Sequence, residues 1–344
     1  MEKKEPKRIL YIDLLNIAAC FGVVVLHCSN TVFDYRLNHT WIFSLLMQVA
    51  FYWTVPIFVM LSGATLMNYR EKYSTKIYFK RRFIHVIGPF LIWSTVFLIW
   101  KLCTGELVWE SWKTTVSWYL GNGIESIYWF FYPLFGMYLL IPVFSMLTGA
   151  GGKKILYYIL MIAAGYSCVL AYLPDHFQIY YNAALFSPLA NGFVGYIVLG
   201  WLLSKENLGK KMRCLIYGIG VSCFALMFVY TLLQSGRDGT FSYTFFDSSG
   251  LTAYGMATAV FVWFRYHDWS FLEKEKIRRT IKAMSGASFG IYLIQMRIIA
   301  PLIWENPEHN GIRWMTVGAV GIYLICMAIV LIVKKIPILR RVFP

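Results

Sequence analysis

The stretch YIDLLNIAACFGVVVLHCS, from Tyr11 to Ser29, decides the fold. It is almost wholly apolar and close to the roughly 20 residues that a membrane-spanning helix needs. It nevertheless contains Asp13, Asn16 and His27. Successive residues of an α-helix are about 100° apart, so these three fall on one face, with Asn16 and His27 about 16 Å apart along the axis. Because polar groups in hydrocarbon usually face a bundle interior or a watery cavity, we expect other helices around this stripe.

The composition indicates that the whole chain belongs in a membrane. Of its 344 residues, 58% are hydrophobic and only 14% are charged, against about 25% charged in a typical soluble domain. The net charge of +15 would suggest nucleic-acid binding in a soluble protein. Here the basic residues cluster at the ends of apolar runs, where they indicate topology. We therefore expect membrane lipids, anionic ones included, as partners and no nucleic acid.

Ten apolar runs are long enough to cross a bilayer as helices. Their length and the absence of period-2 alternation favour helices over a barrel. We predict an all-α polytopic membrane protein, a bundle of about ten transmembrane helices with no soluble domain. Residues 8–343 would form one transmembrane domain, preceded by a short basic cytoplasmic N-terminus at 1–7. The predicted spans are 9–29, 42–67, 83–102, 127–147, 155–173, 185–203, 213–233, 247–265, 284–304 and 313–334.

The charges between the spans predict the orientation of the bundle. With the N-terminus inside, most of the 32 lysine and arginine residues fall in inner segments, as the positive-inside rule requires. An even number of spans then returns the C-terminus to the same side. The basic head MEKKEPKR runs directly into the first span without a small-residue cleavage site, which indicates an uncleaved span. We expect a multi-pass protein with both termini cytoplasmic.

His27 is the first candidate for chemistry. Histidine titrates near neutral pH and is the commonest general base, and His27 lies near the outer end of the first span. The alternative is a polar side chain that bonds a neighbouring helix or extends to the membrane interface. The catalytic interpretation requires a donor substrate that reaches His27 from the inner side.

A second candidate site lies at the inner mouth of the third span, in YFKRRFIHVIGP at 78–89. The positive-inside rule alone accounts for several of its basic residues. The functional alternative is a phosphate clamp, because arginine pairs bidentately with phosphate oxygens and coenzyme A carries a pyrophosphate and a 3′-phosphate. No glycine-rich phosphate loop, paired-histidine motif or C-x-x-C pair occurs in the chain, so no metal is expected.

Further polar and aromatic residues inside the spans are candidates for lining a cavity. Ser62, beside Gly63, marks either a close helix contact or a cavity shared with Asn16. The aromatic residues of WFFYPLFGMYLLIP either line a pocket or form packing and interfacial belts. Arg297 is a functional candidate by default, unless it extends outward to Glu305. The candidate cavity residues are Asp13, Ser62, Trp129, Tyr132, Tyr138, Tyr292, Gln295 and Arg297.

Seven stretches follow one another along almost all of residues 8–343: YIDLLNIAACFGVVVLHCS, VPIFVMLSGATLM, FKRRFIHVIGPFLIW, YWFFYPLFGMYLLIPVF, FVGYIVLGWLL, ASFGIYLIQ and KKIPILRRVF. Together and in this order they resemble the bacterial integral-membrane acyltransferase 3 family. That family includes O-acetyltransferases acting on surface polysaccharides. The resemblance implies a fold of about ten transmembrane helices, which agrees with the number of apolar runs.

The resemblance also implies roles for particular residues. The best-known motif of the family is an arginine, ten residues and then a histidine in the first span. His27 matches the histidine, and Asn16 stands in the arginine position, where it could hydrogen-bond a thioester or a pantetheine amide but not neutralise phosphate. His85 stands where the family tends to have a second basic residue, three after Arg82. Gln295 stands where a histidine often follows Y-L-I.

These features predict a membrane O-acyltransferase, and within that class an O-acetyltransferase of the bacterial inner membrane. The donor would be cytoplasmic acetyl-CoA or another acyl-CoA, and the acceptor a hydroxyl of a cell-surface polysaccharide, glycolipid or lipid-linked precursor. His27 would be catalytic, as general base or transient acyl carrier. The alternative is a transporter or small-molecule-handling membrane module, related to acyltransferases but without acyl transfer. The predicted donor-binding residues are Asn16, Arg81, Arg82 and His85.

Overall fold

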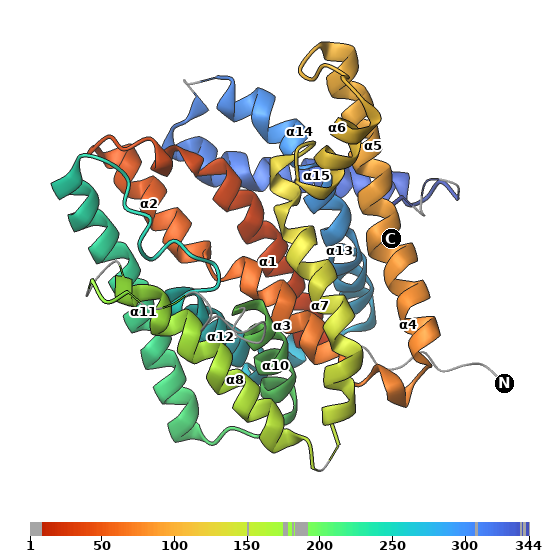
Figure 1. The fold of residues 1–344 in the computed structure, drawn as a ribbon, viewed down its shortest axis with the longest axis vertical. Coiled ribbons are helices and arrows are strands. Elements are labelled where there is room, and N and C mark those ends of the chain that lie inside the picture. The colour runs from red at the N-terminus through yellow and green to blue at the C-terminus, as the bar shows by residue number, and fades with distance from the viewer. Residues whose placement is uncertain are drawn as a thin grey trace.

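The chain folds into a helical bundle, with no strand in the residues that the structure describes (Figure 1). The computed structural model describes residues 9–149, 151–174, 178–180, 182, 192–306, 309–337, 339 and 342–343. The opening apolar run forms α1 (Leu10–Cys28), which packs inside the bundle against α3 (Thr54–Leu66) and α13 (Glu275–Ile294). The all-α membrane fold predicted from the apolar runs is confirmed.

The other helices surround this central group. In Figure 1, α8 and α11 lie to the left of α1, while α4 and α5 lie to the right. The remaining α-helices are α2 (His39–Phe51), α4 (Thr75–Arg82), α5 (Gly88–Thr104), α6 (Trp112–Leu120), α7 (Phe131–Phe144), α8 (Lys153–Cys168), α10 (Gly192–Lys205), α11 (Lys210–Asp238), α12 (Leu251–Tyr266), α14 (Met296–Ile299) and α15 (Ala319–Val333). Short 3₁₀ segments are η1 (Asn30–Phe33), η2 (Tyr69–Glu71), η4 (Ser126–Phe130), η5 (Ser145–Leu147), η6 (Leu170–Tyr172) and η9 (Ser270–Leu272), and π-helical segments are η3 (Phe83–Ile87), η10 (Ala300–Trp304) and η12 (Trp314–Gly318).

Each of the ten predicted spans coincides with a helical segment. In the described residues, seven helices are long and apolar enough to cross a membrane, and a pair bent by 57°, Glu275–Ile294 with Met296–Trp304, makes an eighth. The predicted spans at 185–203 and 247–265 contain shorter helices, α10 with 14 residues and α12 with 16. Residues 185–191 of the first of these lie outside the described residues.

Two prolines explain why two spans are irregular. The second span is interrupted at Tyr52 and Trp53, between α2 and α3. Pro56 has no N–H to donate to the carbonyl of Tyr52, one turn earlier, so the regular ladder stops there. In the third span Pro89 follows the π-helical segment η3, which joins α4 to α5. That π-helical segment changes which side chains share a face.

Glycine permits a close helix crossing between α3 and α10. A Cβ on Gly63 would lie 2.0 Å from the carbonyl oxygen of Ile197, and one on Gly200 would lie 2.1 Å from that of Met60. Small residues let transmembrane helices approach at backbone distance. The interpretation of Gly63 as a close helix contact therefore agrees with the structure, and the adjacent Ser62 is directed elsewhere.

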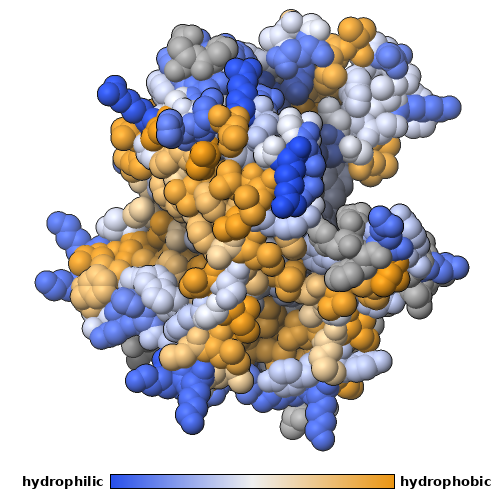
Figure 2. Space-filling view, turned by 90° about the vertical axis from the view of Figure 1, so that its left-hand side faces the viewer, coloured by the Kyte–Doolittle hydropathy of each residue, from blue (hydrophilic) through white to orange (hydrophobic). Residues whose placement is uncertain are grey.

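Basic residues gather at one end of the bundle, where different helices meet. Lys153 pairs with Glu206, and Arg265 donates to the carbonyls of Leu203 and Glu206. We call this the basic end, and it comprises Arg70, Arg82, Lys153, Arg213, Arg265 and Lys334. Figure 2 shows one side of the molecule, on which apolar residues dominate the middle and the most hydrophilic residues lie mainly towards the top and bottom. This distribution suits a protein whose middle faces lipid.

Candidate active site

A cavity of about 1080 Å³ runs along α1 through the centre of the bundle. Its α1 wall extends from Ile12 to His27, and Asn30 continues it beyond the helix. The fifteen steps of helical rise from Ile12 to His27 correspond to about 22 Å. Most of the lining is apolar, with a limited number of polar side chains, as in typical ligand pockets. The cavity therefore connects the basic end with the end of the bundle that carries His27, which we call the histidine end and define by His27, Asn30, Gln48 and Asp247.

At the basic end, α1 is tied to α13 by its polar stripe. The side-chain amide of Asn16 donates to the carbonyl of Ser285 at 2.9 Å and to its hydroxyl at 3.0 Å. One turn further on, the Cys20 thiol donates to the carbonyl of Ser288 at 3.4 Å. Two cations face the same part of the cavity, Arg82 and Lys334. The Lys334 ammonium donates to the carbonyl of Gly286 at 2.8 Å, and the Arg82 guanidinium lies 5.6 Å from the ring centre of Tyr138.

At the histidine end, hydrogen bonds from α2 fix the end of α1. The Ser29 hydroxyl donates to the Val25 carbonyl at 2.7 Å, which closes the last turn. The Gln48 amide donates to the Leu26 carbonyl at 2.6 Å, and the Ser44 hydroxyl donates to the Ser29 carbonyl at 2.6 Å. With its carbonyls satisfied by a neighbouring helix, the end of α1 is held firmly. The half-buried His27 is thereby positioned on the cavity wall.

Eight of the sequence-derived candidates line this one cavity. They come from α1, α3, α4, α7, α13 and the 3₁₀ segment η4, so no local sequence pattern joins them. The two alternatives for the Ser62–Gly63 pair apply together, because Ser62 shares the cavity with Asn16 while Gly63 contacts α10. The eight are Asp13, Asn16, His27, Ser62, Arg82, Trp129, Tyr138 and Tyr292.

Two of the predicted donor-binding residues lie elsewhere. Arg81 is exposed, with its guanidinium 4.4 Å from the ring centre of Tyr73. His85 is exposed as well, whereas Val86 lines the cavity with Arg82. In an α-helix, residues three or four positions apart share a face. In the wider turn of the π-helical segment, the residue three positions after Arg82 is turned away, whereas the residue four positions after it stays aligned. Of the two predicted arginines, the structure places only Arg82 at the cavity.

Tyr132 and Gln295 are likewise not cavity residues. The Tyr132 hydroxyl donates to the Tyr119 carbonyl at 2.5 Å, in a small separate depression beside α6. Gln295 lies at the bend between α13 and α14 and is 1% exposed. Among the described residues, neither atom of its amide group has a hydrogen-bond partner. At this bend the side chain of Gln295 points into the packed interior rather than into the cavity along α1.

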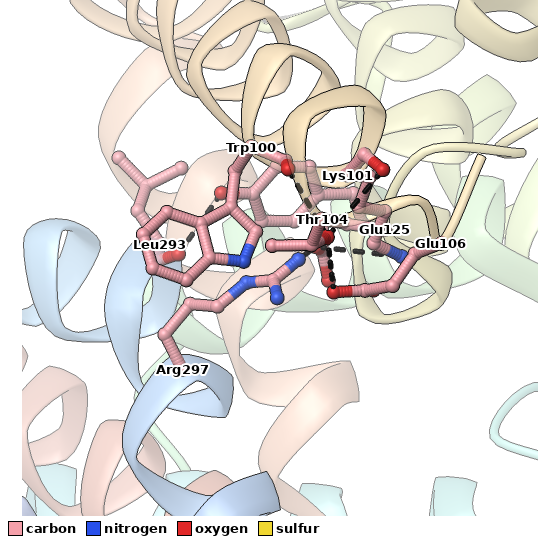
Figure 3. A network of polar contacts seen from close by, with 8 residues as sticks. Trp100, Lys101, Thr104, Glu106, Glu125, Leu293 and Arg297 are labelled. Carbon is pink, nitrogen blue, oxygen red and sulfur yellow. Dashed lines mark hydrogen bonds and ion pairs between the residues drawn. The ribbon is translucent and has the colours of Figure 1, made fainter. Parts of the chain in front are cut away.

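Arg297 forms part of a separate ionic cluster, shown in Figure 3. Its guanidinium donates to the carboxylate of Glu125, and the Lys101 ammonium lies 3.7 Å from the same carboxylate. The guanidinium also lies 4.8 Å from the ring centre of Phe97. The alternative partner, Glu305, is wrong, because the loop before η4 brings Glu125 to Arg297 instead. Arg297 is thus an intramembrane charge with a protein counter-charge.

Sequence reasoning missed several polar residues of the cavity. Lys334 is one of the lysine and arginine residues that indicate topology, Gln48 lies inside the apolar run at 42–67, and Asp247 is the first residue of the run at 247–265. No spacing rule connects these positions with His27, because each belongs to a different segment. The missed polar lining residues include Asn30, Gln48, Asp247, Ser248, Ser285, Ser288 and Lys334.

Fold and site together define the class: a multi-pass membrane protein whose helices enclose a polar-lined cavity between a cationic end and a histidine. A family model described as an acyltransferase domain matches residues 9–333. The chain therefore belongs to the acyltransferase 3 family and is a membrane acyltransferase, as the seven sequence stretches predicted. Comparisons with curated proteins and with solved structures gave no match.

Proposed function

We propose that this acyltransferase is an O-acetyltransferase of the bacterial inner membrane. It would take an acetyl group from cytoplasmic acetyl-CoA and place it on a hydroxyl of a surface polysaccharide, glycolipid or lipid-linked precursor. The basic end would face the cytoplasm, in keeping with the positive-inside rule, and both termini would lie there. The donor would enter from that end, and the acceptor would meet it at His27.

The observation that carries this proposal is one cavity with Arg82 and Lys334 at one end and His27 at the other. Asn16 and His27, eleven residues apart on α1, are separated by about 16 Å of helical rise. The pantetheine arm of coenzyme A is long and narrow enough to extend along such a wall. Its phosphates would remain at the basic end, where Arg82 pairs with phosphate oxygens and Lys334 adds a second positive charge.

His27 would act as the general base. The acceptor hydroxyl oxygen attacks the thioester carbonyl while the imidazole removes its proton. A C–O ester bond forms, the C–S bond breaks, and the proton passes from the imidazole to the departing thiolate of coenzyme A. A positioned base of this kind contributes about 10²–10⁴ in rate. Asn16, already bonded to α13 through its amide N–H groups, would offer its carbonyl oxygen to the N–H groups of the pantetheine arm.

Replacing His27 by alanine tests the proposal. In reconstituted protein, we expect His27→Ala to lower acetyl transfer at least about 100-fold, with acetyl-CoA binding and thermal stability nearly unchanged. The matched control is His309→Ala, because His309 stacks on Trp314 at 4.4 Å and does not line the cavity. Full transfer by a normally folded His27→Ala protein would refute the catalytic role.

A second measurement separates acyl transfer from the transporter alternative. Purified protein in detergent should bind radiolabelled acetyl-CoA, and excess unlabelled coenzyme A should displace it. Absence of binding, together with uptake of a polar solute into proteoliposomes, would favour a small-molecule transporter that uses the same cavity.

A further inference from the structure

The two ends of the cavity differ in charge. At the basic end, the lining includes Arg82 and Lys334 together with Asp13. At the histidine end, Asp247 is the only lining residue among those described that carries a full formal charge at neutral pH, and it is negative. An anionic donor therefore meets positive charge where it enters, whereas a second substrate near His27 meets a carboxylate.

The loop between α11 and α12 holds Asp247 in place. Its carboxylate accepts hydrogen bonds from the backbone N–H of Ser249 at 2.8 Å and from its hydroxyl at 2.9 Å. The preceding ring, Phe246, packs 5.1 Å from the ring centre of Tyr52 and 6.4 Å from that of Phe33. These contacts join the loop to the break after α2 and to η1, which directly follows the end of α1. The carboxylate is exposed and lines the same cavity as His27.

The side chains around Asp247 have the chemistry of a sugar subsite. Aromatic rings from Phe33, Tyr52 and Phe246 line this end of the cavity, together with the amides of Asn30 and Gln48. Apolar faces of pyranose rings stack on aromatic rings, while amides and carboxylates accept from or donate to the hydroxyls at their edges. Hydrogen bonds to a charged carboxylate are stronger than neutral ones, so a hydroxyl held by Asp247 is held firmly.

We propose that this end of the cavity is the acceptor subsite, and that Asp247 orients a sugar hydroxyl and selects uncharged or cationic sugars over anionic ones. The inference rests on the proposed function, because it names the substrate class of that same site. Asp247 is a specificity-determining residue here, and His27 keeps the proton transfer. A uronate or phosphorylated sugar bound in this subsite would bring a second negative charge near Asp247, without a lysine or arginine among the described lining residues at this end to offset it.

The experiment compares two acceptor pools that have the same hydroxyls and differ in charge. Both are made from gluco-, galacto- and manno-oligosaccharides whose primary alcohols are oxidised to carboxylates. The oxidised pool keeps these carboxylates, and the neutral pool is the same material after their conversion to methylamides. Reconstituted protein with radiolabelled acetyl-CoA should acetylate the neutral pool at least about ten-fold more efficiently, because like charges a few ångströms apart near a protein surface repel each other. Equal use of both pools, or preference for the oxidised pool, would overturn the inference.

The variant Asp247→Asn keeps the shape of the side chain and its ability to accept from Ser249. We expect its KM for the neutral pool to rise about ten-fold with little change in kcat, since a charge-assisted hydrogen bond is lost, and its preference over the oxidised pool to shrink to about two-fold. The matched control is Asp238→Asn, because Asp238 accepts from Gln234 at 2.8 Å outside the cavity. An Asp247→Asn protein with unchanged KM and unchanged preference would refute the assignment.

Acetyl-CoA binding separates this inference from the proposed function. Protein that binds acetyl-CoA but acetylates neither pool would contradict the sugar subsite and leave the donor site intact. Protein that does not bind acetyl-CoA would contradict the proposed function itself. A folded Asp247→Asn protein is recognised by acetyl-CoA binding equal to that of the wild type.

Discussion

Two polar regions lie within this apolar bundle, and they differ in what surrounds them. Along α1, Asn16 and His27 face a cavity that extends between the two ends of the molecule. Beside α5, Arg297, Glu125 and Lys101 face one another, and the Glu125 side chain is 11% exposed. The first region presents polar groups to open space, and the second pairs them with other protein groups.

The difference shows that a polar residue in a predicted span does not by itself mark a functional site. Arg297 and His27 looked equivalent in the sequence, since each is ionisable and lies near the outer end of a span. Arg297 meets a carboxylate 172 positions earlier in the chain, and its charge is offset in place. A charge removed from water needs such a partner, so the ion pairs of this cluster stabilise the fold. The polar side chains of α1 instead face the cavity, where they are available to a substrate.

Among the substitutions that test this difference between the two polar regions, Glu125→Gln should have the largest effect. The change keeps the size of the side chain but leaves Arg297 and Lys101 facing each other without a counter-charge. Because the Arg297 and Lys101 side chains are 31% and 21% exposed, water offsets part of the loss. We expect a destabilisation of about 2 kcal/mol, less than for a fully buried pair, measured as thermal or denaturant unfolding in detergent.

Glu106→Gln is the matched control for that change. Glu106 is an exposed carboxylate in the same neighbourhood and accepts only from Thr104 at 3.0 Å among the described contacts (Figure 3). Its replacement should change stability by less than about 0.5 kcal/mol. Loss of acetyl transfer without loss of stability in Glu125→Gln would mean that the cluster belongs to the active site after all.

The two neighbouring arginines of α4 provide the next test. Arg82 lines the cavity and Arg81 does not, so only the first should contact the donor phosphates. We expect Arg82→Gln to raise the KM for acetyl-CoA about ten-fold, equivalent to about 1.4 kcal/mol. Arg81→Gln should change it less than about two-fold, as expected for an exposed charge. Equal effects of the two substitutions would contradict the placement of Arg82 alone at the cavity.

The smallest effect is expected at Gln295. Its amide is buried without a hydrogen-bond partner among the described residues, and an unsatisfied buried polar group costs about 1–3 kcal/mol. Gln295→Met, similar in shape and apolar, should therefore leave stability unchanged or raise it by about 1 kcal/mol. Acetyl transfer should also be unchanged, because Gln295 does not line the cavity. A large loss of transfer would place Gln295 in the catalytic machinery.

The helices could be predicted from the sequence because the pattern that indicates a helix lies within a single stretch of the chain. Run length and the absence of alternation predicted helices at all ten positions, and Pro56 and Pro89 coincide with irregularities in the second and third spans. The polar face of α1 also followed from helical periodicity, so Asp13, Asn16 and His27 were grouped correctly on one wall. The family followed from seven stretches in one order, and its match to 9–333 bears this out.

The residues that line the cavity from segments other than α1 could not be predicted in the same way. Asp247 and Lys334 reach it from segments more than two hundred residues away from α1, through a loop and a helix end that carry no recognisable pattern. His85 was misplaced because a π-helical segment alters the three-residue spacing. Tyr132 and Gln295 were misplaced because an aromatic run and a bend do not reveal which of their faces meets open space.

The sequence by itself determined that the chain is a membrane-embedded helical bundle, which family it belongs to, and that its first span carries a polar stripe. These properties depend on composition, periodicity and order along the chain. Only the tertiary structure decided which polar groups share a cavity and which neutralise one another. That choice depends on packing between segments that are distant in the sequence. A shift of one residue along a helix decides whether a side chain points into the cavity or against a neighbouring helix.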